Sequence, residues 1–114
     1  MPHELNKSEK KLARLLIDKG VETEFKNSLQ EVDQIITQWK KGAIDNRAAY
    51  YKMFKTVSDN DKWISRRYDG MTGGRYLLTV ASIYADGQVT AEDIEGFSEE
   101  TKAVLNRWAE VSKE

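Results

Sequence analysis

Apolar residues in the first third of the chain recur at the spacing of an α-helix. They follow one another mainly at steps of three and four: Leu12, Leu16, Val21, Phe25, Leu29, Val32, Ile36 and Trp39. Polar residues fill the positions between them, so one side of the helix is apolar. Asn6 and Glu9 have the spacing of a capping box, and Gly42 is typical of a helix end. The pattern therefore predicts one helix over residues 6–41 that continues through Gly20.

The length of this helix predicts a partner along it. Roughly 36 residues at about 1.5 Å each make a rod of about 50 Å, whereas a compact domain of this size has a radius of gyration of about 13 Å. The rest of the chain is too short to cover the rod alone, so we expect a second copy or another partner to do so. The expected dimer interface comprises Phe25, Leu29, Val32 and Ile36.

A second helix is predicted after a short loop, with Asp45 as its N-cap. Its expected inner face consists of Tyr50, Met53, Phe54 and Val57. Residues 58–61 (Ser-Asp-Asn-Asp) favour a turn, because such side chains bond nearby backbone in place of helix. Residues 63–68 then form either a short third helix or a continuation of the second.

Glycines at 70, 73 and 74 predict a sharp break in the last part of the chain. Residues 76–85 are predicted as a helix, since no second strand-like run lies nearby to pair with them. Thr90 and Asp93 predict a further short helix that ends at Gly96, and Ser98 caps the last helix. The expected inward residues of that last helix are Val104, Leu105, Trp108 and Val111.

These elements predict an all-α fold: a long N-terminal helix followed by short helices packed as a small helical domain, residues 1–114, that forms a homodimer. Apolar residues make up 39% of the 114 and charged residues 32%, which fits a globular protein. The net charge of −1 provides no global field for nucleic acid or an anionic membrane. The chain has no cysteine, no signal-peptide pattern and no membrane-spanning run, so we expect a cytoplasmic protein.

Candidate catalytic chemistry is sparse. His3 is the chain's one histidine, which excludes histidine-based triads and His-rich metal sites. Residues 86–89 (Asp-Gly-Gln-Val) followed by Asp93 resemble the second half of an EF-hand loop, but too few oxygens remain for a calcium site. We therefore expect no catalytic residues, no metal and no cofactor, and a protein that is not an enzyme.

Arginines and aromatic residues gather near the predicted third helix: Lys62, Trp63, Arg66, Arg67, Tyr68, Arg75 and Tyr76. Such residues form the hot spots of protein–protein interfaces and can also bind single-stranded nucleic acid. Asp59, Asp61 and Asp69 lower the local charge, which favours a protein partner over a nucleic acid. A third interpretation is that some of the rings are core residues and the arginines are simply solvated.

The order of elements and several segments resemble the fluorescence recovery protein family of cyanobacteria and its relatives in other bacteria. Residues 9–25 (EKKLARLLIDKGVETEF) are similar to its first helix, residues 64–69 (ISRRYD) to its I-D-x-K-Y-D segment, and residues 76–105 to its last helices. The resemblance implies an all-α homodimer without enzymatic activity that binds an orange carotenoid protein and speeds its return from the light-activated form. Where the family has Trp and His-Asp, this chain has Tyr51 and Phe54-Lys55.

We therefore predict a non-enzymatic regulator or adaptor that shifts the conformational state of a protein client. The client could be a carotenoid-binding protein. The expected partner-binding residues are Tyr51, Phe54, Trp63, Arg66, Arg67 and Tyr68. The alternative is a small nucleic-acid-binding or regulatory protein that uses the same arginine and aromatic cluster.

Overall fold

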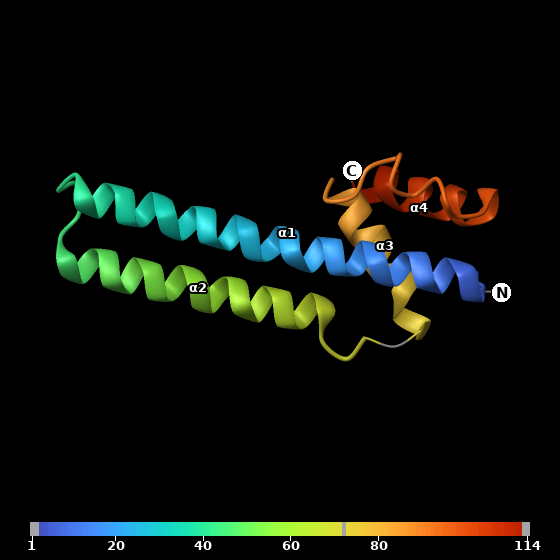
Figure 1. Cartoon of the computed structure of the whole chain (residues 1–114), viewed down its shortest axis with the longest axis horizontal. Coiled ribbons are helices and arrows are strands. Elements are labelled where there is room, and N and C mark those ends of the chain that lie inside the picture. Colours follow the sequence, from blue (N-terminus) through green and yellow to red (C-terminus); the bar gives the residue numbers. More distant parts are fainter. Residues whose placement is uncertain (1–2, 72, 113–114) are drawn as a thin grey trace. The chain divides into compact units, whose positions relative to one another are not determined.

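The computed structural model describes residues 3–71 and 73–112. Its helices are α1 (Lys7–Lys40), α2 (Asn46–Tyr68), α3 (Tyr76–Ala85) and α4 (Glu99–Ser112), and a 3-10 turn, η1 (Gly73–Arg75), precedes α3 (Figure 1). The described residues contain no β-strand, which confirms the predicted all-α class. In the same residues, no helix has both the length and the apolar character needed to cross a membrane.

The helix α1 is uninterrupted, as predicted, and Gly20 lies buried within it. Its start is the predicted capping box: the Glu9 N–H donates to Asn6 Oδ1 at 2.8 Å, and the Asn6 N–H donates to Glu9 Oε1 at 3.2 Å. The chain leaves the helix at Gly42, whose φ of +78° is in the left-handed region that glycine adopts without a steric penalty. The predicted boundaries of α1 are therefore confirmed to within a residue or two.

The helix α2 begins at its predicted N-cap, Asp45, whose carboxylate accepts the backbone N–H three residues on. It then runs without a break to its end, so the turn predicted at residues 58–61 is wrong and the alternative of a continuous second helix is confirmed. One of the polar side chains there bonds across the hairpin instead. Asn60 Nδ2 donates to Ser28 Oγ of α1 at 2.9 Å. A tertiary contact therefore outweighs the local preference for a turn.

The backbone divides into two compact units, which we describe separately. The core unit comprises Met1–Val21 and Gly70–Glu114, and the hairpin unit comprises Glu22–Asp69. The first part of α1 belongs to the core unit, and the remainder of α1 belongs with α2 to the hairpin unit. A single domain over the whole chain stays a prediction.

The core unit contains a well-packed apolar interior. The backbones of α3 and α4 approach each other closely. Ile83 of α3 and Leu105 of α4 are fully buried. The buried apolar side chains of this unit are Leu5, Ala13, Leu16, Ile17, Tyr76, Val80, Ala81, Ile83, Val89, Ile94, Phe97 and Leu105. In α4, Val111 is largely exposed and Trp108 is 42% exposed, so their predicted inward orientation is wrong. They lie toward the end of the helix, beyond the last fully buried position, Leu105.

The segment between α3 and α4 is a series of turns and contains no α-helix, so the short helix predicted there is also wrong. The expected bonds are nevertheless present: the Thr90 N–H donates to Asp93 Oδ2 at 2.8 Å, and the Asp93 N–H donates to Thr90 Oγ1 at 3.2 Å. A Cβ atom at Gly96 would lie 2.8 Å from Leu12 Cδ2. The turns therefore bring the backbone close against α1, which a glycine permits.

Glu9 joins the starts of two helices in the core unit. Besides the capping box of α1, its Oε2 accepts the Ser98 N–H at 3.1 Å and the Thr101 hydroxyl at 2.6 Å, at the start of α4. Burial by itself opposes ionisation, but these hydrogen bonds outweigh it and lower the pKa of the Glu9 carboxyl. His3 Nε2 lies 2.6 Å from the same Thr101 hydroxyl. The caps at the starts of α1 and α4 are therefore linked to each other through the Glu9 side chain.

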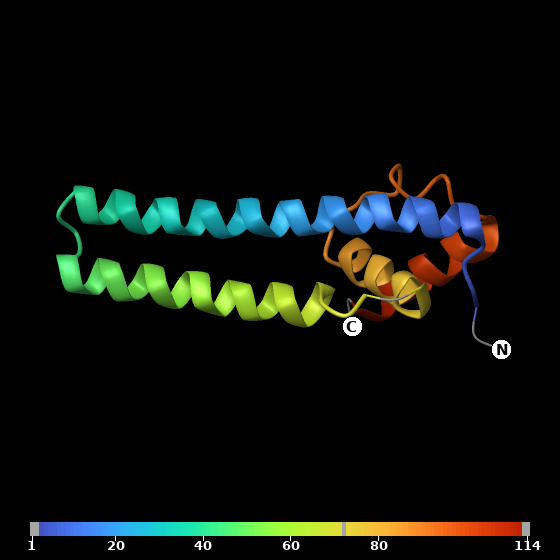
Figure 2. The same ribbon diagram turned by 60° about the horizontal axis from the view of Figure 1, so that its bottom comes forward.

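The hairpin unit consists of α2 lying antiparallel beside the second part of α1 (Figures 1 and 2). Long side chains bridge the two helices, whose backbones approach one another less closely than those of α3 and α4. Ile64 is the one buried apolar side chain among the described residues of this unit. Tyr50, Phe54 and Val57, predicted as an inner face, are exposed. The inward prediction is wrong because a two-helix layer has no third layer to cover that face.

Candidate functional site

One side of the hairpin unit carries apolar side chains from both helices. On α1, Phe25, Leu29, Val32 and Ile36 follow at steps of four, three and four and so share one side. Leu29 is 69% exposed and Phe25 is 46% exposed, while the other two are partly buried. The residues predicted as a dimer interface therefore form an accessible stripe on α1.

A second stripe, on α2, opens on the same side. It contains Tyr50, Met53, Phe54 and Val57, with Phe54 64% exposed. Two bonds across the hairpin fix the register, one from Asn60 to Ser28 and one from Trp39 Nε1 to Asn46 Oδ1 at 2.7 Å. This register places Phe54 of α2 at the level of Val32 of α1. We call the eight residues of the two stripes the apolar face: Phe25, Leu29, Val32, Ile36, Tyr50, Met53, Phe54 and Val57.

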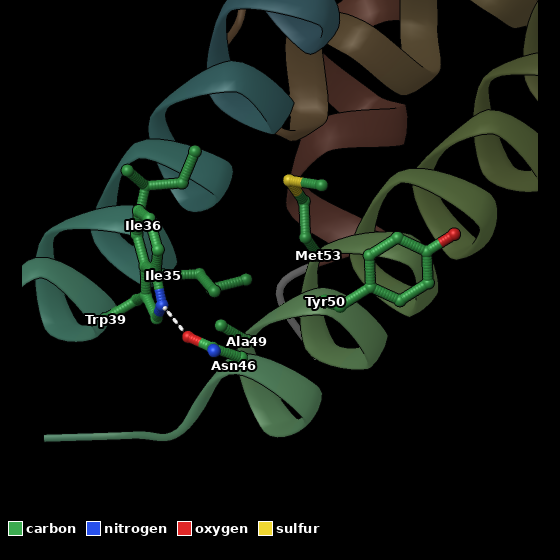
Figure 3. A pocket seen from close by; sticks show the side chains of 7 residues that line it. All are labelled: Ile35, Ile36, Trp39, Asn46, Ala49, Tyr50 and Met53. Atoms are coloured by element: carbon green, nitrogen blue, oxygen red, sulfur yellow. Dashed lines mark hydrogen bonds between the residues drawn. The ribbon is translucent and has the colours of Figure 1, made fainter. Parts of the chain in front are cut away.

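A shallow depression shows that the two stripes meet. Its volume is about 270 Å³, and its walls are almost entirely apolar. The lining residues are Ile35, Ile36 and Trp39 from α1, with Asn46, Ala49, Tyr50 and Met53 from α2 (Figure 3). Since Ile36 and Tyr50 line one depression, the stripes to which they belong face the same side of the hairpin. Trp39 and Asn46 close one end of it with their hydrogen bond (Figure 3).

The residues predicted to bind a partner are divided between two sides of α2. Phe54 belongs to the apolar face, whereas Arg66 lies twelve residues later and therefore about 120° away around the helix. Tyr51 and Arg66 are exposed, and Tyr68 is partly buried. The structure therefore does not gather the predicted residues into one patch. Arg75, the most distant arginine of the sequence cluster, belongs to the core unit.

Trp63 and Arg67 are held in place by a buried carboxylate of α1. The Trp63 indole N–H donates to Glu24 Oε1 at 2.8 Å, and Arg67 Nη1 donates to the same oxygen at 3.1 Å. The side chains of Arg67 and Glu24 are 7% and 9% exposed, and Arg67 Cζ lies 5.1 Å from the centre of the Trp63 ring. Arg67 thus fixes α2 to α1, while the Trp63 ring remains about half exposed with a fixed orientation.

The sequence interpretation missed Lys52 and Lys55, which extend the predicted basic cluster along the outward side of α2. Four cationic side chains lie at steps that keep them on one side of the helix, and all are exposed: Lys52, Lys55, Lys62 and Arg66. We call these four residues the basic stripe. The pattern is visible in the sequence, because charged residues recur every three or four positions from Lys52 to Arg66. It was obscured because the cluster predicted from the sequence begins at Lys62 and leaves out Lys52 and Lys55.

Candidate metal or catalytic groupings are not evident. No group of three or more His, Asp and Glu residues close enough to hold a metal ion occurs in residues 3–71 and 73–112. Glu9, Ser98 and Thr101 do contact one another, but their bonds are those of helix caps. The most developed surface feature is therefore the apolar face, whose chemistry is suited to binding a protein.

Comparisons of the chain with models of protein families, with curated proteins and with solved structures gave no match.

Proposed function

We propose that this protein is a non-enzymatic homodimer that binds a protein client and shifts its conformational state. The observation that carries the proposal is the apolar face. Phe25, Leu29, Tyr50, Phe54 and Val57 are between 46% and 69% exposed. At about 150–250 Å² for each aromatic side chain, this face exposes on the order of 500 Å². That is the upper end of what monomers show. With its polar rim, it approaches the roughly 800 Å² that each partner buries in a standard interface.

A second copy is the occupant that best fits this face. A hairpin of two helices buries only one seam, and a second hairpin packed against it completes a four-helix bundle with a shared interior.

Regulation of a client requires a difference in affinity. A dimer of this kind shifts the client only as far as it binds one client state better than the other. The resemblance to the fluorescence recovery protein family supports an orange carotenoid protein as the first client to test. If the purified protein speeds the dark recovery of light-activated orange carotenoid protein, that client is supported, and an unchanged recovery rate would exclude it.

Light scattering after size-exclusion chromatography tests the dimer. We expect about twice the chain mass of 13.1 kDa at micromolar concentration. Leu29→Asp and Val32→Asp should each reduce the mass toward that of one chain, because a charge buried without a partner is costly. A wild-type mass of one chain would contradict the proposal.

The matched control is Leu15→Asp. Leu15 lies on the same helix, in its core-unit part, and is 62% exposed. This variant should keep the dimer mass and the wild-type helix content by circular dichroism. If Leu15→Asp and Leu29→Asp lower the mass equally, the effect is one of general destabilisation and the apolar face is not the interface.

A further inference from the structure

The basic stripe lies on a side of α2 that the proposed dimer leaves uncovered. Arg66 lies nine residues after Val57 of the apolar face, so the two side chains are about 180° apart around the helix. Within the stripe, Lys52, Lys55, Lys62 and Arg66 occupy a 3–4 repeat whose middle position is Asp59. A second copy seated on the apolar face therefore leaves these cations exposed to solvent.

The charges of the stripe are largely uncompensated on its own helix. Lys55 Nζ pairs with Asp59 Oδ2 at 3.0 Å. No ion pair involves Lys52, Lys62 or Arg66 among the residues that the structure describes. From the first to the last cation the stripe spans about 21 Å, the length of four helical turns. This is a linear positive surface with room for an extended or helical anionic segment.

Two aromatic rings border the stripe. Trp63 follows one of its lysines directly, and its half-exposed ring is held by the hydrogen bond to Glu24 and by Arg67. Tyr51 is 62% exposed and lies one turn before Lys55. A ring whose orientation is already fixed loses little entropy when a partner covers it, which favours it as an anchor.

We propose that the basic stripe, with Trp63 and Tyr51, binds an acidic segment of a partner protein. The inference rests on the proposed protein-binding function and separates its two surfaces: the apolar face binds a second copy, and the outward side of α2 binds the client. Complementary charge speeds the encounter and sets the register, while the aromatic rings supply the desolvated contact.

An acid within the stripe favours a protein over a nucleic acid as the ligand. Asp59 lies between Lys55 and Lys62 on the same side of the helix. A nucleic-acid backbone carries a charge at every phosphate and would be repelled at Asp59. A protein segment can place its acidic residues opposite the cations and a neutral residue opposite Asp59.

Fluorescence anisotropy with a defined probe tests this inference. The probe is a labelled peptide of about 16 residues, long enough to span the stripe as a helix, with glutamate at every third or fourth position and alanine elsewhere. The full-length protein should bind it, and the affinity should fall steeply between low and physiological salt. The same peptide with glutamine in place of glutamate should bind at least about tenfold more weakly, a difference of about 1.4 kcal/mol.

The decisive variant combines Lys52→Glu, Lys62→Glu and Arg66→Glu. It should reduce the affinity for the glutamate peptide by at least about tenfold. The matched control reverses three exposed cations of the core unit, Lys10, Lys11 and Arg107, to glutamate. The control changes the net charge by the same amount and should keep the wild-type affinity.

Separate measurements distinguish the failure of this inference from the failure of the proposed function. The triple variant of the stripe should keep the dimer mass and the helix content of the wild type. Equal binding by the two triple variants, or equal binding of the glutamate and glutamine peptides, would overturn the assignment of the stripe even if the dimer is confirmed. Tighter binding of a single-stranded oligothymidylate than of the glutamate peptide would overturn it in favour of nucleic acid.

Discussion

The core unit and the hairpin unit bury their apolar residues in different ways. Among the described residues, every buried apolar side chain except Ile64 belongs to the core unit. Most of the large exposed apolar side chains belong to the hairpin unit, including Leu29, Phe54 and Trp63. One helix, α1, contributes to both units. The same periodic pattern in that helix therefore leads to an enclosed core at one end and to an open face at the other.

The difference shows what the two units require for stability. The core unit has layers on more than one side of its buried helices, so its interior is shielded by its own chain. The hairpin unit has a single layer with one seam, whose contacts include a buried ion pair between Arg67 and Glu24. Removing either partner of such a pair is costly, but the pair itself adds little net stability. We therefore expect the hairpin unit to depend for most of its stability on the contacts that the proposed second copy makes with the apolar face.

The largest loss of stability is expected for a substitution in the interior of the core unit. Leu105→Ala removes a fully buried side chain of the core unit, so it should lower the free energy of unfolding by about 2–5 kcal/mol. Urea denaturation monitored by circular dichroism measures this change in the free energy of unfolding. This loss should be the same at low and high protein concentration, since the cavity lies within one chain.

Leu29→Ala is the corresponding change on the apolar face. If a second copy covers Leu29, the loss of unfolding free energy caused by Leu29→Ala should grow with protein concentration. The reason is that dimerisation contributes to apparent stability only where dimers form. A change below about 0.5 kcal/mol at every concentration is what an ordinary exposed position gives. That result would remove the distinction drawn here between the two units.

The next effect concerns the buried carboxylate of the core unit. Glu9→Gln keeps the shape of the side chain but removes its charge, so we expect a loss of about 1–3 kcal/mol at neutral pH. The folded-state pKa of Glu9 is lowered from its ordinary value of 4.5. The ionised form is therefore favoured by folding, and its contribution is complete above the unfolded-state pKa and lost as the pH falls through the lower, folded-state value.

The stability difference between wild type and Glu9→Gln should accordingly shrink in acid. Urea denaturation at neutral pH and at about pH 3 measures the change. Glu4→Gln, at an exposed position of the same unit, is the control and should shift stability by less than about 0.5 kcal/mol at both pH values. A difference that is equal at the two pH values would show that the charge of Glu9 contributes nothing to folding.

Local signals in the sequence predicted the helix boundaries well. Asn6, Gly42 and Asp45 each act through bonds or backbone angles within a few residues, and each was assigned correctly. Contacts between distant residues were not predictable in this way. The bond from Thr101 to Glu9 joins residues 92 positions apart, and no local pattern links them.

The errors in the hairpin unit have a common physical origin. Periodicity identifies which residues share a side of a helix, but it does not show whether another layer covers that side. The pattern therefore predicts an inner face at Tyr50 and Val57 that the single chain does not cover. At residues 58–61, the turn-forming side chains predict a break, whereas the hydrogen bond from Asn60 to Ser28 favours a continuous helix. For the same reason, the sequence suggested binding residues without showing that Phe54 and Arg66 lie on different sides of α2.

The smallest expected effect on stability contrasts the surface charges of the hairpin unit with the buried charge of Glu9. Asp59→Asn removes the partner of Lys55, but both side chains are more than half exposed. Exposed pairs of this kind contribute about 0.2–1 kcal/mol at most, and i,i+4 pairs about 0.3–0.5 kcal/mol, so stability should hardly change. Affinity for the glutamate peptide should instead rise by a few-fold, because the substitution removes the one negative charge within the basic stripe. A variant that loses affinity would show that Asp59 orders the stripe for binding, and the stripe could then not be treated as a simple row of cations.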